Sequence, residues 1–187
     1  MAGAEEFDKF LQDPNLALFL RHNVDFYQRK WRSMFARAQS IDRMATTSSW
    51  NWAAFFIGVS WLLYRKMYLR AIAVFGVLLF PDILGAAIEE DLQALRWLLS
   101  LAVSIVMGQF GNAMYFRRSF DQVMAAERRS GDPAEIQARL RKRGGTSWLS
   151  GVLGSIALYA IAAVILAALI LPRILQYYGA MVPRLAH

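Results

Sequence analysis

The chain has 187 residues, of which 57% are hydrophobic and 19% are charged, below the roughly 25% charge of soluble domains. Its net charge is +7, and the basic residues cluster beside apolar segments, so we expect anionic lipid headgroups rather than nucleic acid as their partner. Cysteine is absent, which excludes disulfides and thiolate chemistry. Because the two histidines, His22 and His187, lie far apart, we expect neither a metal site nor a cofactor.

Residues 1–49 form a polar leader that is rich in aromatic side chains. Asp13 followed by Pro14 is typical of a helix start, and apolar residues then recur at three- and four-residue steps from Leu16 to Ile41. This pattern predicts an amphipathic helix that either lies on a membrane or packs against the rest of the protein. The leader lacks the apolar core of a signal peptide, so we expect the N-terminus to stay in the cytoplasm.

The next segment, residues 50–70, has the composition of the water–lipid boundary, and we call it the aromatic-basic segment. It holds three tryptophans, an apolar run at residues 52–63, and then three basic residues among tyrosines. The apolar run has twelve residues, whereas crossing about 30 Å of hydrocarbon takes roughly 20. The pattern predicts a short helix that dips into the membrane or lies in its surface.

Three longer apolar stretches follow, at residues 71–88, 95–116 and 148–171. Each is long enough to span a bilayer, and the strict alternation of barrel strands is absent. The sequence therefore predicts an all-α membrane protein with three transmembrane helices. Residues 71–116 form a two-span hairpin, and residues 148–187 form the last span with an outer tail.

Lysine and arginine counts predict the orientation. Seven lie in the leader, three in the aromatic-basic segment and eight in the loop at residues 117–147, whereas the turn at residues 89–91 is wholly acidic. We expect the first three regions in the cytoplasm and the acidic turn and C-terminal tail outside. This assignment holds only if the short apolar run returns to the side from which it came.

The basic loop at residues 117–147 predicts a helical hairpin on the cytoplasmic face. The second span is expected to continue to about Arg129 and to break at Ser130-Gly131. Asp132-Pro133 is typical of a new helix, and Gly144-Gly145 of its end. Thr146 or Ser147 can then cap the last span.

Asp82 is the one acidic residue within an apolar stretch. An intramembrane carboxylate suggests an ion or proton site. The alternative that we favour puts Asp82 near the outer interface, with Pro81 ending the regular helix and Arg96 available as a structural ion-pair partner. Gln109 and Asn112 are expected to hydrogen-bond between helices.

No nucleophile–base pair, paired catalytic carboxylates or phosphate-binding glycine loop is visible in the sequence, so we expect a protein that is not an enzyme. Four glycines on the second and third spans are expected to allow close helix packing. The residues that we expect to contact lipid or a partner protein are Trp31, Trp50, Trp52, Trp61, Tyr64, Arg65, Lys66, Tyr68, Arg70, Arg141, Lys142 and Arg143.

Residues 50–56 together with residues 61–68 resemble the core motif of the bacterial DUF2628 membrane proteins. Residues 21–27 with Lys30-Trp31 are similar to the aromatic element that precedes this motif in the family. Residues 111–115 and 144–147 resemble its later blocks, so that the resemblance covers roughly residues 18–170. It implies a multi-span protein of the bacterial inner membrane and supplies no activity.

These features favour a non-catalytic accessory subunit that docks on a larger membrane assembly through the leader helix and the aromatic-basic segment. The alternative is a small transport or lipid-handling protein, for which a homo-oligomer is one candidate form. This alternative depends on the short apolar run at residues 52–63 lying beside a helix break at Pro81-Asp82, because interrupted membrane helices line transport sites.

Overall fold

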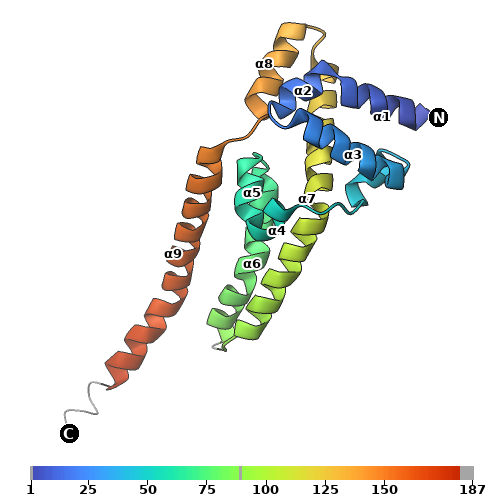
Figure 1. Cartoon of the computed structure of the whole chain (residues 1–187). Coiled ribbons are helices and arrows are strands. Elements are labelled where there is room, and N and C mark those ends of the chain that lie inside the picture. The colour runs from blue at the N-terminus through green and yellow to red at the C-terminus, as the bar shows by residue number, and fades with distance from the viewer. Residues whose placement is uncertain (1, 89, 182–187) are drawn as a thin grey trace.

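The computed structural model describes residues 2–88 and 90–181, in which all regular structure is helical (Figure 1). The elements in chain order are α1 (Ala2–Gln12), α2 (Pro14–Leu20), α3 (Val24–Ala38), the 3₁₀ helix η1 (Asp42–Thr46), α4 (Trp52–Phe56), α5 (Gly58–Tyr64), α6 (Tyr68–Ile88), α7 (Gln93–Arg129), α8 (Pro133–Arg143) and α9 (Trp148–Met181).

Three of these helices, α6, α7 and α9, are long and apolar enough to cross a membrane. Their large apolar side chains are exposed, as at Leu69, Leu98 and Val164, which is the arrangement that lipid rather than water solvates. The chain is therefore an all-α membrane protein with three candidate spans, as the sequence predicts. Helix α7 has 37 residues, and its second half leaves the apolar layer and carries the polar part of the molecule (Figure 1).

The leader packs onto the second half of α7 through aromatic side chains. Phe7 stacks on Phe35 with ring centroids 4.0 Å apart, and Phe10 meets Phe116 and Phe120 at 5.8 and 5.0 Å. These contacts bury the apolar faces of α1, α2 and α3, so that the leader covers its own protein instead of lying on a membrane. The sequence reading missed α1, whose Phe7, Phe10 and Leu11 follow helical spacing.

The single helix expected from Pro14 onward is also wrong, because the leader divides into α2 and α3. Asp13 caps α2 as predicted, with its side chain accepting a hydrogen bond from the Asn15 amide at 2.7 Å. At the other end, Arg21 and Asn23 both have φ of 60°, and these positive values stop the helix and turn the chain.

The basic loop folds as the sequence predicts. Helix α7 ends at Arg129, Asp132 caps α8, and Ser147 caps α9 by accepting a hydrogen bond from the Ser150 amide at 3.1 Å. Helix α8 lies against α2, where the Gly145 amide donates to the Phe19 carbonyl at 2.6 Å. The leader and α8 thus form one polar cap at the end of α7 (Figure 1).

The apolar run of the aromatic-basic segment forms two short helices that we call the α4–α5 hairpin. An extended segment before α4 pairs with α7 as far as Gly108, where α4 packs against α7. Helix α5 then runs in the opposite direction, so that Arg65 at its end contacts Tyr115. At the lowest point Gly58 faces Met107, about 12 Å along the helix axis from Tyr115 at 1.5 Å per residue. The hairpin therefore descends beside the apolar half of α7 and returns to the end from which it came.

Candidate functional site

Asn112 holds the extended entry of the hairpin against α7. It is 1% exposed, and its side-chain amide donates to the backbone carbonyls of Ser49 and Trp50 at 3.1 and 3.2 Å. Its side-chain oxygen accepts from Asn51 at 3.0 Å. In addition, the amides of Ser49 and Asn51 donate to carbonyls of α7 at 2.7 Å each. Non-helical backbone at membrane depth needs such internal partners, and Asn112 supplies them.

Two glycines of α7 let α4 approach closely. A Cβ atom on Gly111 would lie 2.8 Å from the Cβ atom of Ala54, and one on Gly108 would lie 3.1 Å from that of Phe55. On the other side of the hairpin, Gly151 and Gly154 of α9 face Tyr64 and Leu63 in the same way. The packing role that the sequence predicts for these glycines is confirmed.

Arg65 lies at the end of the hairpin in a cage of tyrosines. Its guanidinium carbon is 5.0, 5.4 and 4.6 Å from the ring centroids of Tyr27, Tyr64 and Tyr115. It donates to the Tyr27 hydroxyl at 2.5 Å and to the Tyr115 hydroxyl at 3.5 Å, while its Nε has no hydrogen-bond partner. Arg65 is 6% exposed, and the ion pairs among the described residues do not include it. Its charge is therefore balanced only by aromatic faces and neutral oxygens.

A cavity of about 550 Å³ opens between α3 and the hairpin beside this cage. Its described lining residues are Asn23, Phe26, Tyr27, Lys30, Trp50, Asn51, Trp52, Ala53, Trp61, Arg65 and Asn112. The lining thus combines five aromatic side chains with two cations and no carboxylate. The indole Nε1 of Trp50 is a buried donor without a partner, like Arg65 Nε.

Tyr27 keeps its proton throughout the physiological range. Burial raises its pKa to about 12, an effect that the nearby positive charge of Arg65 only partly offsets. Because its oxygen already accepts a hydrogen bond from Arg65, the hydroxyl proton is available to a further acceptor. The cavity is therefore a donor-rich site of positive charge with apolar walls.

Two of the tryptophans expected to contact lipid or a partner are buried, and for Trp31 that expectation is wrong. Trp31 is 0% exposed, packs on Phe116 at 5.3 Å and donates to the Asn112 carbonyl at 3.3 Å. Trp61 is 3% exposed and lies edge-on to Tyr115. Arg65 is enclosed by the tyrosine cage, but Arg65 and Trp61 both line the cavity, so ligand contact by these two residues stays a prediction.

The remaining basic candidates meet at the polar cap, apart from the cavity. Lys66 donates to the carbonyls of Lys142 and Gly144 at 3.2 and 2.7 Å, at the end of α8 where cations are favourable. Burial and the charges of Arg21 and Arg118 lower the pKa of Lys66. An open groove of about 450 Å³ brings Lys66, Tyr68, Lys142 and Arg143 together.

Four further candidates do not line this groove. Arg70 donates to the Met114 carbonyl at 2.9 Å, and the Arg141 carbonyl accepts from Arg21. Tyr64 borders the Arg65 cage, whereas Trp52 keeps 63% of its side chain exposed at the start of α4. Lipid contact by these residues stays a prediction.

Asp82 forms an ion pair with Arg96 at 2.9 Å, joining α6 to the start of α7. This is the structural partner that the sequence offered. The expectation that Pro81 ends the regular helix is wrong, because α6 continues through Pro81 to Ile88. A proline inside a membrane helix is tolerated where neighbouring groups satisfy the freed carbonyl.

The family model for a protein of unknown function, DUF2628, matches residues 15–119, more than half of the chain. The chain belongs to this family. All described residues that line the cavity fall within the matched segment, whereas residues 144–147, which the sequence reading included, lie beyond it. No curated protein and no solved structure matches the chain.

Sequence reasoning placed Arg65 and the tryptophans near one another but missed the groups that complete the site. Tyr27 and Tyr115 come from helices 38 and 50 positions away from Arg65 along the chain. The sequence indicates Lys30 only through the orientation count and the family motif. One signal was available: Tyr27 and Lys30 lie one helical turn apart, three residues along the same helix.

Proposed function

We propose that this protein is a non-catalytic integral membrane subunit that docks on a larger membrane assembly through α9. Supporting this is the face of α9 that is turned away from α5 and α6. Ala160, Ala163 and Ala167 are all exposed there and follow the three- and four-residue spacing of one helical face. Small residues let a second transmembrane helix approach closely, which a purely lipid-facing helix does not need. The leader packs its apolar face on α7, so the proposal places the docking surface on α9 instead.

Co-purification tests this role. The tagged protein, extracted in mild detergent, is expected to bring down one or more membrane proteins in fixed ratio, identified by mass spectrometry. Ala163→Leu is expected to reduce their recovery at least fivefold, since the added side chain fills the approach surface.

Ala73→Leu is the matched control, because Ala73 is an exposed alanine on the spanning helix α6. It is expected to leave recovery unchanged. A wild-type protein that is a monodisperse monomer without companions would contradict the proposal, as would equal losses in both variants.

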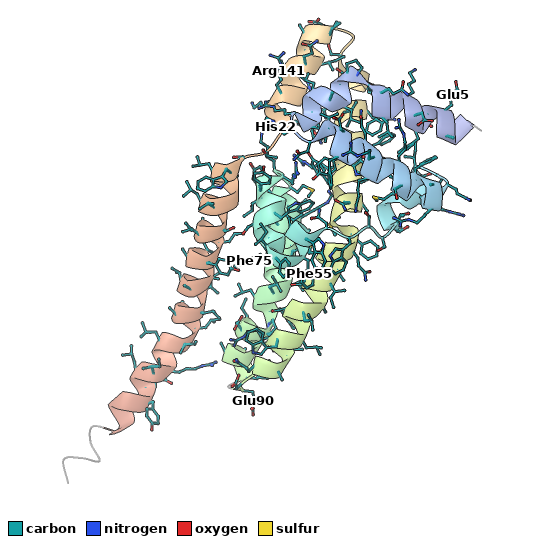
Figure 2. The ribbon with its side chains drawn as sticks, viewed as in Figure 1. Glu5, His22, Phe55, Phe75, Glu90 and Arg141 are labelled. Carbon is teal, nitrogen blue, oxygen red and sulfur yellow. The ribbon has the colours of Figure 1, made fainter. Side chains whose placement is uncertain are left out.

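We further propose that the membrane is the bacterial inner membrane, with the N-terminus in the cytoplasm and the C-terminus in the periplasm. The distribution of charge supports this orientation. Arg141 and Glu90 lie at opposite ends of the molecule in Figure 2, and Arg141 belongs to the polar cap. Lysine and arginine favour the cytoplasmic side.

A lipid-handling role is the second candidate, and the cavity beside Arg65 is the observation that favours it. Transport has weaker support, since it rested on a helix break at Pro81-Asp82. Helix α6 is continuous there, and Arg96 neutralises Asp82.

A further inference from the structure

The cavity beside Arg65 has a charge that the described protein residues leave uncompensated. Removing a guanidinium from water is costly unless a counter-charge or full hydrogen bonding replaces the lost hydration. Here the three tyrosine rings and two hydroxyls balance part of the charge, while Arg65 Nε and Trp50 Nε1 remain buried donors without acceptors. A negative charge in the adjoining cavity, which both residues line, would compensate the guanidinium.

The rest of the lining selects the same chemistry. Lys30 adds a second cation, and Tyr27 has a hydroxyl proton free to donate. An aromatic cage alone would also suit a quaternary ammonium group, but Arg65 and Lys30 would repel it. A neutral ligand would leave the guanidinium charge as it is. The site therefore favours an anion over a cation or an uncharged group.

The walls of the cavity indicate what the anion is attached to. Trp52 lines the cavity and is 63% exposed, and Phe56 and Ile57 continue the exposed apolar surface at 72% and 55%. Trp52 and Phe56 are stacked with ring centroids 5.9 Å apart, forming a continuous path from the cavity toward the deep end of the hairpin. A free anion would make no contact with this apolar surface, whereas the acyl chain of a lipid would pack along it.

We propose that the cavity between α3 and the α4–α5 hairpin binds the phosphate group of an anionic membrane lipid, held by Arg65, Lys30 and Trp50, with an acyl chain along Trp52 and Phe56. This assignment deepens the lipid-handling alternative and does not depend on docking through α9.

Binding to the detergent-purified full chain tests the proposal, with native mass spectrometry as the readout. The probes are phosphatidylglycerol, phosphatidylcholine and inorganic phosphate. We expect phosphatidylglycerol to bind at least tenfold more tightly than phosphatidylcholine, because the zwitterionic headgroup brings its own cation into a positive site. Lys30→Gln and Trp50→Phe are each expected to weaken phosphatidylglycerol binding at least tenfold, the usual loss for a charge-assisted hydrogen bond.

Matched controls separate a built site from general attraction to a basic surface. Arg29→Gln removes one positive charge from the exposed face of α3, next to Lys30, and Lys142→Gln removes one from the polar cap. Both are expected to change binding less than twofold. The Trp50 variant is informative because its indole N–H has no protein partner to lose and phenylalanine keeps an aromatic ring beside Phe55.

Equal losses in Arg29→Gln and Lys30→Gln would overturn the site, as would equal affinity for the two lipids. Binding of inorganic phosphate as tight as that of phosphatidylglycerol would overturn the lipid as the source of the anion. Failure of this proposal is distinguishable from failure of the docking role, since Ala163→Leu is expected to keep full lipid binding.

Discussion

Replacing Gly111 by alanine is expected to destabilise the protein by about 1–3 kcal/mol, and Gly111→Val by more. The new Cβ atom would lie 2.8 Å from the Cβ atom of Ala54, which is 0% exposed. Both atoms are fixed directly to backbone, so no side-chain rotation relieves the contact. Helix α4 must move away from α7, and the hydrogen bonds of the hairpin entry lengthen with it. The apparent melting temperature in detergent measures the loss.

Gly76→Ala is the control for this prediction. Gly76 lies in α6 with nothing within 4 Å of the position that a Cβ atom would take. The change is expected to leave stability unchanged or to raise it by up to about 1 kcal/mol through helix propensity. Equal destabilisation by the two substitutions would mean that α4 does not lie against Gly111.

Asn112→Leu is expected to cost at least about 3 kcal/mol, with a loss of the folded hairpin. The substitution leaves the carbonyls of Ser49 and Trp50 and the side chain of Asn51 without the partner they now have. Each buried group left unsatisfied costs about 1–3 kcal/mol, and no water is at hand within an apolar layer. Protease accessibility near the hairpin and the apparent melting temperature both report the effect.

Gln109→Leu provides the comparison for Asn112. Gln109 lies on the same helix less than one turn away and contributes its backbone carbonyl, which accepts from Ser49, to the hairpin. Because leucine keeps that carbonyl, the change is expected to stay within about 0.5 kcal/mol. A Gln109→Leu protein as unstable as Asn112→Leu would show that general polarity, not the Asn112 amide, holds the segment.

The spans and the loop helices could be predicted from the sequence because their signals are local. The lengths of the apolar stretches predict α6, α7 and α9. The Asp132-Pro133 and Gly144-Gly145 pairs predict where α8 begins and ends. The return of the hairpin followed from two separate arguments, its length and the charges that follow it. The sequence left open whether it dips or lies flat, and the contact of Gly58 with Met107 places it beside the apolar half of α7.

The cavity could not be predicted because its members meet only through tertiary packing. The tyrosine cage requires α3 to lie across α7, and nothing local to Tyr27 or Tyr115 indicates that crossing. The burial of Trp31 could not be predicted for the same reason, because it also depends on the packing of α3 on α7. Amphipathic periodicity shows that a helix buries one face, but it does not distinguish a lipid surface from a neighbouring helix.

The central claim is that the α4–α5 hairpin enters and leaves the membrane on one side, and single-cysteine labelling tests it most directly. The native chain has no cysteine, so each variant carries one reporter. Ala45→Cys lies before the hairpin, Glu90→Cys in the turn between α6 and α7, and Gly131→Cys after α7, all at exposed positions. A membrane-impermeant maleimide is added to intact cells.

Two spanning helices separate the hairpin from residue 131, so a returning hairpin puts residues 45 and 131 on the same side. The expected result is labelling at position 90 in intact cells, and at positions 45 and 131 only after the membrane is permeabilised. Labelling of positions 45 and 131 from opposite sides would contradict the account, because the hairpin would then cross the membrane.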